Sequence, residues 1–157
     1  MPQSQRISHI ALDEKTLVRR SPQIEHERKV AIYDLLEENH FCPAGDLSGP
    51  YNIVLGIEED RLQFDVCDDK DQSLTFITLS LKSFRGIIKD YFLICESYFE
   101  AIKTKAPSQI EAIDMGRRGL HNEGAELLRD RLSEKVDVDI DTARRLFTLI
   151  CVLHVRG

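Results

Sequence analysis

The chain has 157 residues, enough for one domain with a sizeable buried core, and its apolar (42%) and charged (31%) fractions are those of an ordinary globular protein. The net charge of -6 argues against nucleic acid as the main partner, because affinity for phosphate backbones depends on an excess of lysine and arginine. The N-terminus has no apolar signal segment, and no apolar run approaches the roughly 20 residues of a membrane helix, so we expect a cytoplasmic protein without a membrane span.

The N-terminal part predicts one strand, one helix and a loop. Residues 6–12 can form the strand. Ser21 suits the N-cap of a helix that continues to about Asn39, with apolar residues at helical spacing. Residues 40–50 hold two prolines and two glycines between periodic segments, which predicts a loop.

Three strands follow, at 51–57, 62–66 and 74–81, each with alternating apolar residues. Short acidic turns join them, which is typical of an antiparallel meander. The alternation changes phase between Phe76 and Ile77, and this predicts either a bulge or burial of the third strand on both faces.

The C-terminal half predicts mainly helices. Residues 83–103 have an apolar face so wide that we expect this helix to be the central one. Residues 136–140 alternate and can add a short strand. The segment 142–155 is rich in β-branched residues, but its apolar spacing favours a helix over a strand, with Asp141 as the N-cap.

These elements predict a single α+β domain over residues 1–157, with residues 1–5 flexible. An antiparallel meander of three to five strands would pack against several α-helices. The four cysteines have no C-x-x-C spacing, so we expect reduced and mostly buried thiols.

Several stretches of the chain resemble one bacterial family: "RRSPQIEHERKVAIYDLLEEN", "GPY", "IKDYFLICESYFEAI", "PSQIEAIDMGRRGLHNEGAELL" and "DTARRLFTLICVLHVRG". Together they resemble the alphaproteobacterial uncharacterised protein family 0262 over residues 6–157, and "DMGRRGLHNEG" is the most specific string. The resemblance implies no activity, cofactor or catalytic residue, because the family has none assigned.

The stretch "DMGRRGLHNEG", which begins at Asp114, has two structural interpretations. One continuous helix would place Asp114, Arg118 and His121 on one stripe, but its three glycines would together cost about 3 kcal/mol relative to alanine. A helix break at Gly119, with Asn122 capping the next helix, explains the same residues as helix ends, and we favour it.

A break there would also bring the free N–H groups of the second helix close to two guanidinium groups. That arrangement suits a phosphate or carboxylate, so the predicted ligand-binding residues are Arg117, Arg118, His121 and Asn122. The chain has no phosphate-binding loop motif, and we predict no cofactor. The leading hypothesis is a binding protein for a small anionic ligand or a protein partner.

Two other functions stay open. An enzyme could use His121 as general acid or base, oriented by Asp114 or Glu123, with the arginines holding an anionic substrate. A homo-oligomeric structural protein could instead use the glycines to pack two helices closely.

The segment "IEHERK" supplies secondary candidates: Glu25, His26 and Arg28. Their simplest interpretation is a solvated helix face. Alternatively they meet His121 and Glu123 across the fold as an acid/base or metal cluster. The chain lacks local ligand spacing such as H-E-x-x-H, so we predict no metal site.

Overall fold

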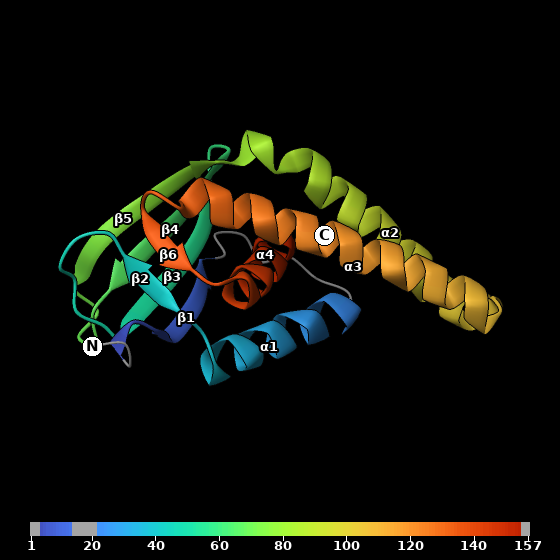
Figure 1. The fold of residues 1–157 in the computed structure, drawn as a ribbon, viewed down its shortest axis with the longest axis horizontal. Coiled ribbons are helices and arrows are strands. Elements are labelled where there is room, and N and C mark those ends of the chain that lie inside the picture. The colour runs from blue at the N-terminus through green and yellow to red at the C-terminus, as the bar shows by residue number, and fades with distance from the viewer. Residues whose placement is uncertain (1–3, 14–21, 155–157) are drawn as a thin grey trace.

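The computed structural model describes residues 4–13 and 22–154. Their elements follow in chain order (Figure 1): β1 (Ile7–Asp13), α1 (Pro22–Glu37), β2 (Phe41–Pro43), β3 (Tyr51–Glu58), β4 (Arg61–Cys67), β5 (Ser73–Ser80), the 3₁₀ helix η2 (Leu81–Ser83), α2 (Arg85–Thr104), α3 (Pro107–Leu132), β6 (Val136–Val138) and α4 (Ile140–His154). The α+β class is confirmed. The predicted N-cap Ser21 and part of the segment predicted to be flexible lie outside the described residues.

The main sheet has the strand order β1-β3-β4-β5. Its antiparallel part is the predicted meander: Leu55 of β3 lies opposite Phe64 of β4, which lies opposite Ile77 of β5. The strand β1 pairs with β3 in parallel, so the sheet is mixed and not wholly antiparallel as predicted. Alternation identifies a strand but carries no information on the direction of its neighbour, which explains this error.

The phase change in β5 is a bulge that lies nearer the start of the strand than predicted. Val66 pairs with Thr75 and Cys67 with Ser73, which leaves Leu74 as the extra residue. The register continues unbroken through Phe76, whose side chain is exposed on the outer face. The strand is therefore not buried on both faces.

A second sheet pairs β6, which confirms the short strand predicted at residues 136–140, with β2, which lies in the segment predicted to be a loop. Phe41 of β2 pairs with Val138 of β6 in an antiparallel ladder of three residues per strand. The phenyl ring of Phe41 is fully buried and its centroid lies 5.8 Å from that of Tyr51. The three residues of β2 stand between prolines and glycines without a detectable period, and the partner strand is distant in sequence, so only the fold shows this strand.

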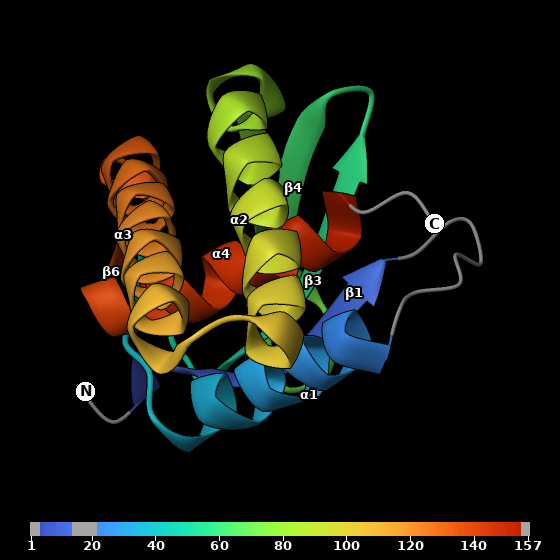
Figure 2. The ribbon, with the colours of Figure 1, turned by 90° about the vertical axis from the view of Figure 1, so that its right-hand side faces the viewer.

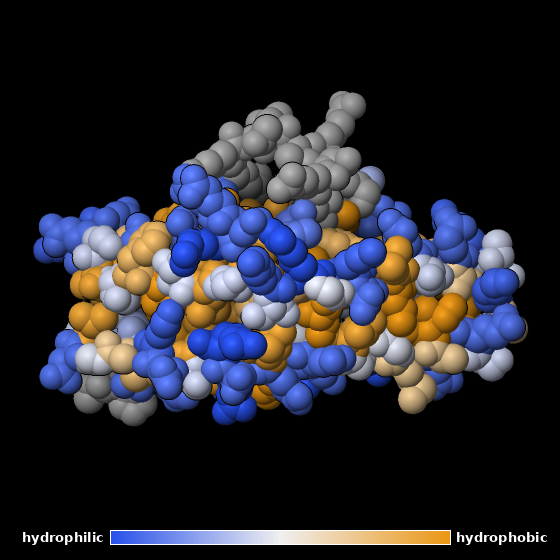
Figure 3. Space-filling view, turned by 90° about the horizontal axis from the view of Figure 1, so that it is seen from above, coloured by the Kyte–Doolittle hydropathy of each residue, from blue (hydrophilic) through white to orange (hydrophobic). Residues whose placement is uncertain are grey.

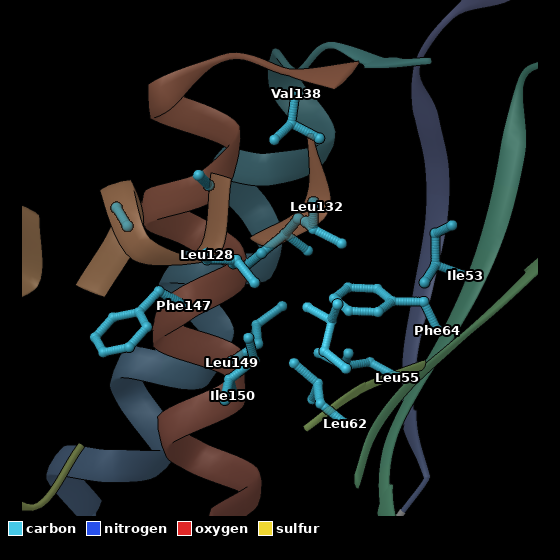
Figure 4. Close-up of a cluster of buried hydrophobic side chains, with 14 of the residues drawn as sticks. Ile53, Leu55, Leu62, Phe64, Leu128, Leu132, Val138, Phe147, Leu149 and Ile150 are labelled. Carbon is cyan, nitrogen blue, oxygen red and sulfur yellow. The ribbon is translucent and has the colours of Figure 1, made fainter. Parts of the chain in front are cut away.

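The central helix is α4, which corrects the prediction that residues 83–103 fill this place. Eight of its residues are buried, and it contacts β3, α1 and α3. Figure 4 shows Leu149 of α4 directed toward Leu55 and Phe64 of the sheet, with Phe147 on the side away from the sheet. The helical assignment of this segment is confirmed.

Helices α2 and α3 form an antiparallel hairpin that extends beyond the sheet (Figure 1). Only part of the wide apolar face of α2 is covered: Leu93 and Ile102 are 53% and 50% exposed. Figure 3 shows hydrophobic surface between polar side chains on the face that is uppermost in Figure 1. The wide apolar stripe thus predicted the helix α2 correctly, but it did not predict how much of that helix is buried.

The helix α3 runs without interruption through residues 114–124, so the predicted break at Gly119 and the predicted cap at Asn122 are wrong. Two of its glycines allow close packing. A Cβ at Gly124 would lie 2.3 Å from the ring of Phe147, and one at Gly116 would lie 2.8 Å from Ile94 Cδ1. The packing of α4 and α2 against bare backbone offsets the poor helix propensity of glycine.

The ends of two helices also differ from prediction. Asp139 and not Asp141 caps α4, because its carboxylate accepts from the N–H of Thr142 at 2.9 Å. The helix α1 ends before Asn39, whose side chain accepts from the N–H of Ile7 (2.6 Å) and donates to the carbonyl of the same residue (2.9 Å). This side chain therefore fixes β1 to the end of α1. All four cysteines are free thiols, three of them buried.

Candidate functional site

A groove of about 570 Å3 lies where α1 approaches α3 and α4. Figure 2 shows α1 beneath the ends of α2 and α3, with α4 crossing behind them. The groove gathers all four predicted ligand-binding residues. Its lining consists of His26, Glu27, Val30, Ala31, Asp34, Tyr91, Arg117, Arg118, His121, Asn122, Arg144, Arg145 and Thr148.

Two of the lining arginines are held from one carboxylate on the same helix. Arg117 donates through Nε (3.0 Å) and Nη2 (2.6 Å) to Oδ1 of Asp114, and Arg118 Nη2 donates to Oδ2 (2.6 Å). These hydrogen bonds, that of Arg117 first, lower the pKa of Asp114 despite the opposing effect of burial. The guanidinium of Arg117 also lies 5.0 Å from the centre of the Tyr98 ring. Asp114 therefore orients both arginines.

A second arginine pair comes from α4, and sequence analysis missed it. Arg144 donates to Oδ1 of Asn122 (2.7 Å) and to Asp141 (2.7 Å), and Arg145 reaches the Glu38 carbonyl at 3.5 Å. The predicted binding residue Asn122 thus positions an arginine of another helix. The signal was present in the sequence as another Arg-Arg pair, in "TARRLF", but no local pattern placed it beside Arg117 and Arg118.

His121 is packed between aromatic rings at the edge of the groove. Its ring centre lies 5.4 Å from that of Tyr91 and 5.7 Å from that of Phe147. The Thr148 hydroxyl donates to the carbonyl of Arg144, so its oxygen can accept the Nε2–H of His121, at 2.7 Å. Burial, and next the charges of Arg117 and Arg144, lower the pKa of His121 to about 4. The imidazole is therefore neutral at pH 7.

The predicted acid/base pairs of His121 are absent from this arrangement. Asp114 is engaged by the two arginines, and Glu123 is exposed and does not line the groove. In a helix, residues two apart point to opposite sides, so Glu123 cannot orient His121. The enzyme hypothesis loses both of its predicted carboxylates.

Of the secondary candidates Glu25, His26 and Arg28, only His26 lines the groove. His26 lines the groove with His121, as the sequence allowed, whereas Glu25 pairs with Arg28 on α1 at 3.9 Å. Among the residues that the structure describes, no group of three or more histidine, cysteine or acidic side chains could hold a metal ion.

Glu27 is the residue of this segment that sequence analysis passed over. It is half-buried and lines the groove from α1. Burial raises the pKa of Glu27, although the charges of Arg117 and His26 oppose the rise. A carboxylate held this way in a groove can receive a hydrogen-bond donor or a cation.

A second compartment of about 470 Å3 adjoins the groove. It shares three lining residues with the first: His26, Glu27 and Arg117. Its other walls are more apolar, formed by Pro22, Gln23, Tyr98 and Phe99. The shared residues therefore stand at the junction of a polar and an apolar compartment.

Comparison with known proteins places the chain in one family. The model of the Uncharacterised protein family (UPF0262) matches residues 4–156. The chain belongs to this family. A UPF0262 protein of Paramagnetospirillum magneticum is 63% identical over the full length of both chains. A UPF0262 protein of Rhodospirillum rubrum is 64% identical over 94% of this chain and 91% of its own.

A third member of UPF0262, from Agrobacterium fabrum, is 56% identical over 97% of this chain and 96% of its own. No solved structure is significantly similar. None of the described helices is both long and apolar enough to cross a membrane. Family membership confirms the resemblance seen in the sequence, and the description of the family assigns no activity.

Proposed function

We propose that this UPF0262 protein binds a small anionic molecule, bearing a phosphate or carboxylate group, in the groove between α1, α3 and α4. One observation carries the proposal: two arginine pairs, Arg117 with Arg118 and Arg144 with Arg145, line the same groove. The lining has four arginines against two carboxylates, Glu27 and Asp34, and is therefore a local excess of positive side chains on a chain of net charge -6. Convergent guanidinium groups are suited to hold such an anion by paired, charge-assisted hydrogen bonds.

The pairing of these arginines with protein carboxylates does not use up their donors. Each guanidinium has five N–H groups. Arg118 donates one hydrogen bond to Asp114 and its side chain is 72% exposed. Pairing holds the side chains in place before a ligand arrives, which reduces the entropy lost on binding.

Titration calorimetry with inorganic phosphate, pyrophosphate and citrate tests the proposal. We expect binding to the unmodified chain and a loss of about tenfold or more in affinity for Arg118→Gln, because one charged hydrogen bond to the anion is removed. Arg131→Gln is the matched control, since Arg131 is an exposed residue of the same helix outside the groove and the charge change is identical.

Two results would contradict the proposal. One is the absence of heat, together with the absence of a rise in melting temperature, for every anion at millimolar concentration. The other is an equal loss of affinity in Arg118→Gln and Arg131→Gln, which would show only a response to net charge.

A further inference from the structure

The two walls of the groove carry opposite charge. The arginines come from α3 and α4, whereas α1 presents Glu27 and Asp34, seven residues apart and therefore on one side of the helix. Across the described part of the chain, no hydrogen bond or ion pair engages either of these two carboxylates. Three of the four arginines that line the groove pair instead with Asp114 and Asp141, and Arg145 donates to the Glu38 carbonyl.

The arginines of α3 and α4 and the carboxylates of α1 line the same groove without pairing with each other. A ligand that has one negative and one positive group could bind both walls. A ligand with only negative charge would be attracted by the arginines and repelled by the acidic stripe of α1. A half-buried carboxylate that has no hydrogen bond or ion pair has lost part of its hydration, and a bound cation would compensate for that loss. Glu27 is the better placed of the two, because it lines both compartments of the groove and Asp34 lines only the first.

Glu27 is placed where a ligand that occupies both compartments would contact it. It lines both compartments of the groove, together with His26 and Arg117. A molecule that extends from the arginines of α4 toward the apolar walls at Phe99 would run past the three shared residues, of which Glu27 is the only carboxylate.

We propose that the ligand is zwitterionic: its anionic group binds the arginines and a protonated amine of the same molecule binds the Glu27 carboxylate. This inference rests on the proposed function, because it requires the anion to bind in the groove. It narrows the ligand class from anions in general to amino-phosphates and amino acids.

Matched pairs of small phosphates test the charge requirement on the full chain. O-phosphoethanolamine and propyl phosphate have the same phosphate and the same number of heavy atoms, and differ in an ammonium against a methyl group. At about pH 8, which favours the ionised carboxylate, we expect the ammonium compound to bind at least about tenfold more tightly. 3-Aminopropyl phosphate and butyl phosphate repeat the comparison with a longer spacer.

The variant Glu27→Gln should invert this selectivity. It removes the partner of the amine and also the repulsion of the phosphate, so phosphoethanolamine should lose affinity while propyl phosphate gains it. The glutamine side chain is close in shape to the neutral acid that burial favours, so the variant should fold, and its unfolding curve checks this. Glu123→Gln, which alters an exposed carboxylate outside the groove, should keep the original preference.

The outcomes separate the two proposals. Equal binding of ammonium and alkyl phosphates, weakened alike by Arg118→Gln, would overturn the zwitterion and leave anion binding intact. Loss of the amine preference in Glu123→Gln as well as in Glu27→Gln would overturn it too. Failure of every phosphate to bind would overturn both proposals.

Discussion

Two glycines of α3 should respond to alanine with opposite signs. At Gly119 a Cβ would meet no atom within 4 Å, and the residue lies inside a continuous helix. At Gly124 a Cβ would lie 2.3–2.6 Å from three atoms of the Phe147 ring, which is fully buried. The same substitution therefore tests helix propensity at one site and packing at the other.

The magnitudes follow from two separate effects. Alanine in a helix is favoured over glycine by about 1 kcal/mol, so Gly119→Ala should stabilise the fold by up to that amount. Gly124→Ala has the same gain but forces Phe147 or the helix backbone to move, and such overpacking costs about 1–3 kcal/mol. Since several ring atoms would clash with the added methyl group, we expect the upper part of that range. The two variants should differ by roughly 2–3 kcal/mol.

Urea unfolding followed by circular dichroism measures both changes, and thermal unfolding should place Gly119→Ala about 2–4 °C above the parent. The result that refutes this reasoning is a destabilised Gly119→Ala. If α3 were broken there, the glycine would adopt a left-handed conformation and alanine would cost about 1 kcal/mol or more. The sign of that one variant therefore separates a continuous helix from the break that the sequence favours.

Three other perturbations test the rest of the structure. Because the folded state lowers the pKa of His121 to about 4, the unfolded chain binds a proton there between about pH 6.5 and pH 4 and the folded chain does not, so the free energy of unfolding should decrease by the order of 3 kcal/mol as the pH is lowered through this range. His121→Gln should lack this part of the decrease, and a resonance assigned to His121 that titrates above pH 6 would contradict the prediction. Asn39→Ala should lower the free energy of unfolding in urea by about 1–3 kcal/mol, because the buried N–H and carbonyl of Ile7 lose their hydrogen-bond partner. A change within experimental error would show that water replaces the Asn39 side chain. Leu149→Ala should cost about 2–5 kcal/mol, whereas Leu93→Ala should change stability by no more than about 0.5 kcal/mol; equal losses would mean that α2 and α4 share the central place.

Local patterns predicted much of the secondary structure. Alternation of apolar residues was enough for β3, β4 and β5, and helical spacing was enough to assign α4 despite its β-branched residues. These signals depend only on neighbours in the chain. The parallel partner of β1 and the pairing of Phe41 with Val138 depend on distant segments, and no local period reports them.

The prediction of a helix break at Gly119 was wrong for a different reason. Helix propensity counts each glycine of α3 as a cost and contains no information on the side chains that pack against it. The side chains that pack against Gly124 and Gly116 are Phe147 and Ile94, and both lie on other helices. A glycine near the middle of a long periodic segment predicts either an ending or a close helix contact, and only the tertiary fold decides between them.

The candidate site was located in part. The four predicted ligand-binding residues line one groove, because they come from consecutive turns of one helix face. Glu27, Arg144 and Tyr91 come from three other helices, so their place in the same groove follows from the packing of α1, α2 and α4 and not from any motif. The second Arg-Arg pair was visible in the sequence but could not be connected to the first.

The arrangement of carboxylates explains how four guanidinium groups can line one groove. Four guanidinium groups in one hollow would repel one another if they were unpaired. Asp114 and Asp141 pair with three of them and do not line the groove, so the repulsion is reduced without filling the space. His121 avoids adding a further charge, because burial and the neighbouring arginines keep its imidazole neutral. The groove thus keeps oriented N–H donors on one wall and, on the other, the Glu27 carboxylate, which no hydrogen bond or ion pair from residues 4–13 or 22–154 engages; a zwitterion would match this charge pattern.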